Sequence, residues 1–151
     1  MSGATDRLTP IVRVAPAKLN LTLAVIGRRT DGYHDLHTLH VTGIPIGAAK
    51  DGSDNLVLRA LAATRRAVGG GWAGGPGPAP AVAARLDKRI PVAAGLGGGS
   101  SDAAAALDGA LELWGAELDD RTRLAVAAGL GSDVPFFLVG GAALIAGIAG
   151  G

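Results

Sequence analysis

The chain has 151 residues, about the size of one domain, and its 48% of hydrophobic residues is enough for a packed core. The formal net charge of +1 argues against an obligate nucleic-acid-binding protein and against a polybasic membrane-surface protein. The absence of cysteine excludes disulfides, thiolate metal sites and cysteine nucleophiles. Glycine occurs 25 times, roughly 17% of the chain against an average of ~7%, and this excess needs a structural explanation.

The first third of the chain is typical of strands separated by turns. Residues 11–15 and 19–25 are predicted strands, and the second alternates apolar and polar positions with the period of two of a half-buried strand. Residues 27–34 are predicted as a polar turn, and residues 36–42 as a further strand. The pattern assigns no element to residues 43–53.

The middle of the chain mixes helices with a strand. Asp54 is the expected N-cap of a helix over 55–68, and the glycine- and proline-rich residues 69–80 are expected to form a loop with no packed structure of their own. A strand over 82–90 follows, in which apolar and charged positions alternate. Two further helices are predicted, over 101–114 and 119–128. Strands come first and helices later, which indicates an α+β fold rather than a regular βαβ repeat.

Residues 134–151 carry no charge and reach the lower length limit of a membrane span. The segment contains five glycines and Pro135, so a buried strand and turn is the favoured interpretation over a membrane helix. The first ten residues lack the apolar stretch of a secretory signal, which predicts a cytoplasmic protein.

The most informative stretch is PVAAGLGGGSSD, residues 91–102, which runs from a strand into a helix. Its glycines leave backbone N–H groups uncovered, and the positive end of the helix dipole points at the same place. Ser100 and Ser101 add hydroxyls that can reach phosphate oxygens or a magnesium ion. The pattern therefore favours phosphate binding over a glycine turn that only permits close packing.

Two familiar glycine motifs fit this stretch poorly. The Walker A pattern fails because no Lys-Ser/Thr pair follows the glycines. A Rossmann fingerprint would place Ser100 where Gly or Ala belongs, and its ribose-binding acid would have to be Glu112 or Glu117, in or just after the helix. A Rossmann-type dinucleotide-binding protein is kept as an alternative.

Three blocks, in order, resemble one family. They are PAKLNLTLAVIGRRTDGYHDL (16–36), PVAAGLGGGSSDAAAAL (91–107) and LGSDVPFFLVGGAAL (130–144). They are similar to the 4-diphosphocytidyl-2-C-methyl-D-erythritol kinases of the GHMP kinase superfamily. The resemblance implies the GHMP kinase amino-terminal fold (ribosomal protein S5 domain 2-like), a sheet with helices on one face. It also implies transfer of the γ-phosphoryl of ATP to the 2-hydroxyl of the methylerythritol moiety, in the non-mevalonate isoprenoid pathway.

The resemblance assigns roles to individual residues. Lys18 and Asp133 match the catalytic pair of the family. The ATP-binding loop is matched by Pro91, Val92, Ala93, Ala94, Gly95, Leu96, Gly97, Gly98, Gly99, Ser100 and Ser101. Positions near the nucleotide are matched by Asn55 and Lys88, and positions near the substrate by Asn20, Tyr33 and His34. The implied cofactors are ATP and Mg²⁺, and no protein ligand for a metal is assigned.

The chemistry of phosphoryl transfer agrees with these assignments. The transition state is loose, so the reaction asks mainly for positioning and for neutralisation of charge. Asp133 would orient the hydroxyl and accept its proton late, and Lys18 would stabilise charge on the hydroxyl oxygen and the moving phosphoryl group. Without the motifs, Asp133 would be interpreted as a helix cap, Lys18 as a surface lysine and His34 as a turn residue.

The chain also departs from the family. Family members are roughly twice as long, so residues 1–151 correspond to the amino-terminal domain and the carboxy-terminal domain is expected to be absent. The region around residues 43–53 is shorter than in the family, and Asp102 replaces a commoner Asn. These departures predict weak or no activity for this chain alone, and an apolar C-terminal end favours association into a homodimer.

Three functional classes therefore remain. The first is a small-molecule kinase acting on 4-diphosphocytidyl-2-C-methyl-D-erythritol, with no nucleic-acid or membrane partner. The second is a non-catalytic ATP- or phosphate-binding remnant, which would bind ATP without needing Lys18 and Asp133 for turnover. The third is the Rossmann-type protein, which would bind a nicotinamide cofactor in place of ATP.

Overall fold

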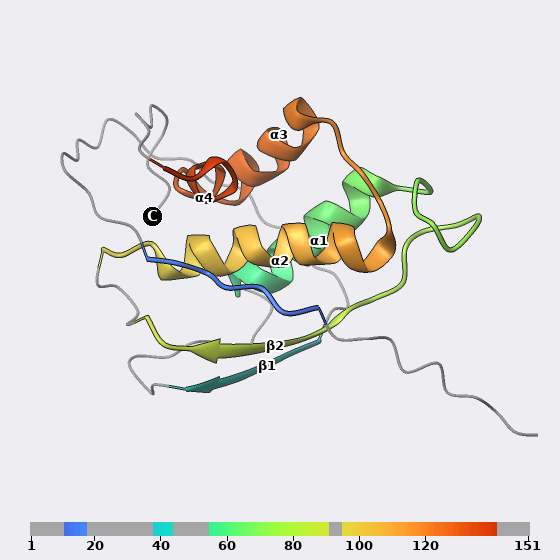
Figure 1. Cartoon of the computed structure of the whole chain (residues 1–151). Helices are drawn as coiled ribbons and strands as arrows, with labels where there is room; N and C mark the ends of the chain where they lie inside the picture. Colours follow the sequence, from blue (N-terminus) through green and yellow to red (C-terminus); the bar gives the residue numbers. More distant parts are fainter. Residues whose placement is uncertain (1–10, 18–37, 44–54, 91–94, 142–151) are drawn as a thin grey trace, which may run out of the picture.

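The computed structural model describes residues 11–17, 38–43, 55–90 and 95–141. Within these ranges the chain forms strands and helices in three layers (Figure 1). The bounds of the elements, in chain order, are β1 Thr38–Gly43, α1 Leu56–Val68, β2 Ala83–Lys88, α2 Gly98–Trp114, α3 Asp120–Leu130 and α4 Val134–Val139.

The two described strands pair in parallel. Thr38 lies opposite Ala83 at one end of the ladder, and Gly43 lies opposite Lys88 at the other. Parallel neighbours need a crossover connection, and α1 lies in the connection between them. The predicted strands over 36–42 and 82–90 are confirmed in position, although β1 is shifted by up to two residues and β2 is shorter.

The helices lie on one face of this sheet, as the α+β prediction requires. In Figure 1, α1 and α2 lie next to the strands, and α3 and α4 lie beyond them. The core lies between α1 and α2, where Leu61, Leu107 and Trp114 are almost completely buried. From the sheet, Ala84 and Leu86 pack against this core. Alternate residues of a strand face the same side, so Lys88 lies on the same face as Ala84 and Leu86, and it is 7% exposed.

Helix α1 begins with a side-chain cap. Asn55 Oδ1 accepts a hydrogen bond from the backbone N–H of Val57 at 2.9 Å, so Asn55 holds the N-cap position. The prediction that Asp54 caps this helix is wrong for that reason, and Asp54 itself lies outside the described residues. Inside the helix, the hydroxyl of the buried Thr64 donates to the carbonyl of Ala60 at 2.8 Å.

Helix α2 begins three residues earlier than predicted, at Gly98. Glycine is a poor helix former, but this position has no room for a side chain. A Cβ on Gly98 would lie 2.9 Å from Cγ2 of Ile90 and 3.2 Å from Nζ of Lys88. Close packing against the end of the sheet therefore places glycine in the first turn, which propensity alone does not anticipate.

Helix α3 has its N-cap at Asp119, one position before its first residue. The carboxylate accepts from the backbone N–H of Thr122 at 2.9 Å and from its hydroxyl at 2.7 Å. These two hydrogen bonds lower the pKa of Asp119 below its usual value. The predicted helix over 119–128 is thus confirmed, with its last turn extended to Leu130.

Two sequence predictions of strands are wrong. Residues 11–17 have no regular secondary structure, and Val12 and Val14 are 85% and 88% exposed, so no half-buried strand forms there. Residues 134–139 form helix α4, where a buried strand was expected. Pro135 occupies the first turn of this helix, where its missing N–H costs no hydrogen bond. The proposed strand over 19–25 lies outside the described residues.

The loop over 69–80 is more ordered than its composition predicts. The indole Nε1 of Trp72 donates to the carbonyl of Gly77 at 3.0 Å, and the backbone N–H of Ala73 donates to the carbonyl of Trp114 at 3.0 Å. Ala79 is fully buried. The loop therefore packs on the end of α2, and the expectation that it has no packed structure is wrong, because one tryptophan supplies the apolar area that glycine and proline lack.

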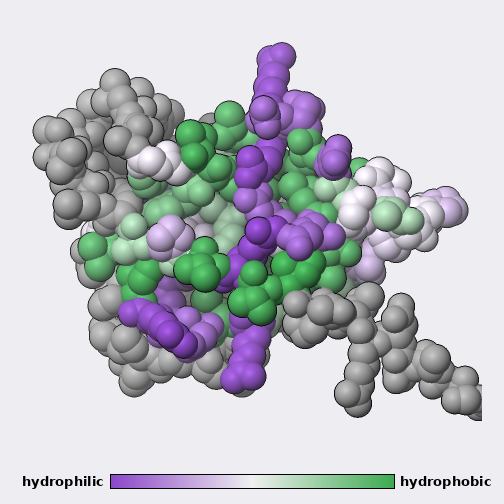
Figure 2. All heavy atoms as spheres, in the orientation of Figure 1, coloured by the Kyte–Doolittle hydropathy of each residue, from purple (hydrophilic) through white to green (hydrophobic). Residues whose placement is uncertain are grey.

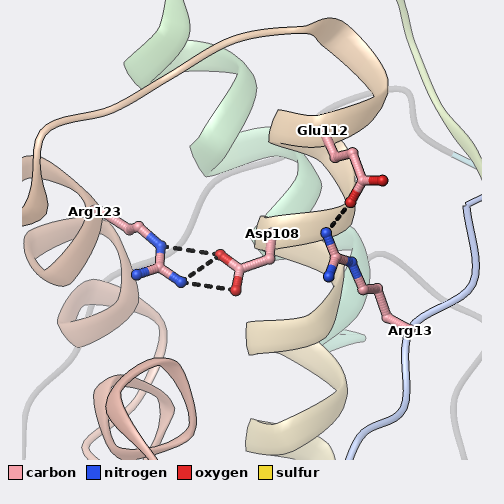
Figure 3. Close-up of polar contacts among 4 residues, drawn as sticks. All are labelled: Arg13, Asp108, Glu112 and Arg123. Atoms are coloured by element: carbon pink, nitrogen blue, oxygen red, sulfur yellow. Dashed lines mark hydrogen bonds and ion pairs between the residues drawn. The ribbon is translucent and has the colours of Figure 1, made fainter.

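Ion pairs connect α2 to its neighbours on the face that Figure 1 shows. Arg123 of α3 binds both carboxylate oxygens of Asp108, at 2.7 to 2.9 Å, and Arg13 pairs with Glu112 one turn further along α2 (Figure 3). In Figure 2, hydrophilic side chains cross this face between hydrophobic ones. None of the helices in the described ranges is long and apolar enough to cross a membrane.

Candidate phosphate-binding site

The glycine-rich connection enters α2 with its backbone amides unprotected. Gly95 and Gly97 have φ values of +70° and +66°, in the left-handed region that only glycine enters readily. Gly97 is the N-cap residue and has no side chain to accept from the helix amides. Ser101 N is the first amide to bond back to it, at 2.9 Å. The amides of residues 98–100 therefore have no intrahelical acceptor and can bind an anion.

Ser101 adds a second feature to this helix start. Its side chain is 1% exposed, and its hydroxyl has no hydrogen-bond partner in the described part of the chain. A buried hydroxyl without a partner costs about 1–3 kcal/mol, so such groups usually serve a ligand or an ordered water. The hydroxyl without a partner and the open amides belong to the same first turn of α2.

Lys88 and Asp102 form a buried ion pair under this turn. Nζ of Lys88, at the end of β2, donates to Oδ2 of Asp102, in the second turn of α2, and each side chain is 8% exposed. The ammonium group also lies against the backbone of Gly98. Asp102 was not among the predicted site residues. A signal for it existed, because Lys88 falls on the inward phase of β2 and a buried cation needs a partner.

Asp133 lies immediately before α4, at the N-cap position, and is half-buried. Its side chain makes no capping hydrogen bond, so position alone supports the helix-cap interpretation. Helix α4 packs on α2, the helix that carries the glycine connection at its start (Figure 1). Asn55, assigned near the nucleotide, holds its Oδ1 on the N–H of Val57 as the α1 cap.

The structure thus brings together one half of the predicted site. Lys88 contacts the glycine turn, and residues 95–101 form it. Asn55 and Asp133 are described at the starts of α1 and α4, and no contact of theirs with the glycine turn is established. Eight other predicted residues lie outside the described ranges: Lys18, Asn20, Tyr33, His34, Pro91, Val92, Ala93 and Ala94. Their positions relative to Asp133 and to the glycine turn stay predictions.

A family model assigns the class of protein. Residues 55–141, more than half of the chain, match the model described as the GHMP kinases N terminal domain. The chain belongs to the GHMP kinases. This range contains α1, β2, the glycine turn and Asp133. Because the chain belongs to this family, the alternative of a Rossmann-type dinucleotide-binding protein is dropped.

Individual relatives narrow the resemblance. The 4-diphosphocytidyl-2-C-methyl-D-erythritol kinase of Deinococcus radiodurans is 44% identical over 164 residues, covering 95% of this chain and 52% of that protein. The enzyme of the same name from Paramagnetospirillum magneticum is 42% identical over 146 residues, covering 83% and 48%. The chain spans about half the length of the curated relatives it matches.

A solved structure agrees with these relatives. The crystal structure of a 4-(cytidine 5'-diphospho)-2C-methyl-D-erythritol kinase is 40% identical and superposes with a TM-score of 0.51, covering 84% of this chain and 48% of the other. The predicted family resemblance and the α+β fold are therefore confirmed.

Proposed function

We propose that this chain is the amino-terminal domain of a kinase that transfers the γ-phosphoryl group of ATP to the 2-hydroxyl of 4-diphosphocytidyl-2-C-methyl-D-erythritol. The observation that carries the proposal is 42–44% identity to kinases named for this substrate. The open amides of residues 98–100 and the orphan hydroxyl of Ser101 support it, because they fit a phosphate-binding role. Residues 1–151 form one GHMP kinase domain in this account, acting in the cytoplasm.

ATP would bind with its phosphates on residues 95–101. The backbone amides at the start of α2 would hold phosphate oxygens, and the hydroxyl of Ser101 would donate to one of them, which satisfies its buried oxygen. Lys88 and Asn55 lie on the nucleotide side of the site. Mg²⁺ would be held mainly by the phosphate oxygens of ATP and would neutralise their charge.

Lys18 and Asp133 form the proposed catalytic pair. Asp133 would orient the acceptor hydroxyl and take its proton as the bond to phosphorus forms. Lys18 would stabilise the negative charge on the acceptor oxygen and on the moving phosphoryl group. Asn20, Tyr33 and His34 would contact the substrate, with His34 near the cytosine. Because the transition state is loose, positioning matters more than the strength of the base.

The test is ADP release by the folded chain with ATP, Mg²⁺ and the proposed substrate. We expect Lys18→Ala and Asp133→Ala to lower turnover by about 100-fold or more. Lys50→Ala and Asp87→Ala are matched controls, because Lys50 lies outside the three motifs and Asp87 is exposed on β2. Equal turnover in all four variants would refute the catalytic pair.

A non-catalytic ATP-binding role is the second candidate. The chain spans about half the length of its relatives. If the relatives complete the active site with residues from their other half, this chain would bind ATP without transferring its phosphoryl group. ATP binding with no ADP release by the folded chain would favour this candidate over the kinase.

A further inference from the structure

The ion pair of Lys88 and Asp102 connects the two sides of the proposed phosphate site. Lys88 is the last residue of β2, and Asp102 lies in the second turn of α2. The glycine-rich connection lies between these residues in the sequence. Both side chains are 8% exposed, so water screens their charges far less than those of a surface pair.

The position of the ammonium group is electrostatically unusual. It lies against Gly98, the first residue of α2, where the helix dipole is already positive. A buried cation at the positive end of a helix is unfavourable unless an anion compensates it. Asp102 is the anion that compensates it among the described residues. A phosphate on the amides of residues 98–100 would be a second anion beside the same ammonium.

We propose that Lys88 and Asp102 together set the affinity of the glycine turn for phosphate. Lys88 supplies a positive charge behind the turn, and Asp102 holds that charge in place and offsets part of it. The inference rests on the proposed function, because it takes the turn as the site of the ATP phosphates. Asp102 is then a positioning residue that acts through Lys88.

Two variants of the full chain separate this role from a structural one. Asp102→Asn keeps the shape of the side chain and an oxygen that can accept from Lys88, but removes the negative charge. The double variant Lys88→Met with Asp102→Leu removes both charges and keeps apolar volume, a replacement that often preserves stability for buried ion pairs. Asp108→Asn is the control, because Asp108 also pairs from α2, with Arg123, at a half-buried site.

The measurement is calorimetric affinity for inorganic tripolyphosphate and for ATP with Mg²⁺, at one ionic strength. We expect Asp102→Asn to bind about fivefold more tightly than the unmodified chain, because the positive charge of Lys88 is then no longer offset by the Asp102 carboxylate. We expect the double variant to bind about fivefold more weakly. Asp108→Asn should bind as the unmodified chain does, although its melting temperature falls.

A purely structural pair predicts a different order. The proposal is overturned if the unmodified chain binds more tightly than both variants, or if the folded double variant binds as tightly as the unmodified chain. The comparison with the double variant can be made even if Asp102→Asn does not fold. Absence of binding in every variant overturns it together with the phosphate site. If the variants bind in the expected order but the unmodified chain shows no turnover, only the proposed kinase activity is contradicted.

Discussion

Gly98 shows how a single position joins sheet, helix and site. Its missing side chain leaves room for Ile90 and Lys88 beside the first turn of α2. The neighbouring Gly99 is different, because a Cβ there would meet no atom within 4 Å. Close packing therefore explains the glycine at position 98, whereas the space around position 99 would admit a side chain.

We predict opposite effects of alanine at these two positions. Gly98→Ala should lower the free energy of unfolding by about 1–3 kcal/mol, because the added methyl group overpacks the contact with Ile90. Gly99→Ala should leave it unchanged or raise it by up to about 1 kcal/mol, since alanine is the better helix former. Urea unfolding of both variants measures the difference, and equal free energies would contradict the packing argument.

Ser101 provides a second test at this scale. Its buried hydroxyl has no partner in the described part of the chain, so Ser101→Ala should raise the free energy of unfolding by up to about 1 kcal/mol while weakening ATP binding. Thr64→Val is the matched control, because the equally buried hydroxyl of Thr64 donates to Ala60. A clear loss of stability in Ser101→Ala would show that the hydroxyl is already satisfied in the free chain.

At the scale of elements, local patterns predicted most of the helices and tertiary packing changed their ends. Asn and Asp caps begin α1 and α3, and both helices lie close to the ranges predicted from the sequence. The apolar run at α4 was predicted as a strand and turn because of its glycines and Pro135, but Pro135 fits the first turn of the helix and Gly140 ends it. Residues 11–15 were predicted as a strand, but Val12 and Val14 face solvent, which a residue pattern alone does not determine.

The cap of α3 makes the stability of the chain depend on pH. Hydrogen bonds from Thr122 lower the pKa of Asp119 in the folded chain, so the ionised carboxylate favours folding. This contribution is fully present above the unfolded pKa of about 4 and is lost as the pH falls through the lower folded pKa. The melting temperature of the unmodified chain should therefore fall more steeply between about pH 5 and pH 3 than that of Asp119→Asn.

Asp119→Asn is the suitable comparison for this titration because asparagine also caps helices but carries no titrating carboxyl group. If the melting temperatures of the two chains fall equally steeply over that pH range, the assigned role of the cap is contradicted.

For the whole molecule, α2 is the element on which the account depends. It packs against α1, α3 and α4, and its outer face receives Arg13 and Arg123 (Figure 3). Its first turn carries the glycine site. The sequence predicted this helix, the phosphate role of its start and the family. It did not predict the ion pair of Lys88 and Asp102, because that pair depends on how β2 and α2 meet in space.

The central claim is phosphoryl transfer to the proposed substrate, and ³¹P nuclear magnetic resonance tests it most directly. The folded chain is incubated with ATP, Mg²⁺ and 4-diphosphocytidyl-2-C-methyl-D-erythritol, beside Asp133→Asn. We predict a new phosphomonoester signal, weak for this chain alone, that grows with ADP, requires both substrates and is lost in the variant. ATP binding by the folded chain without any phosphomonoester would contradict it.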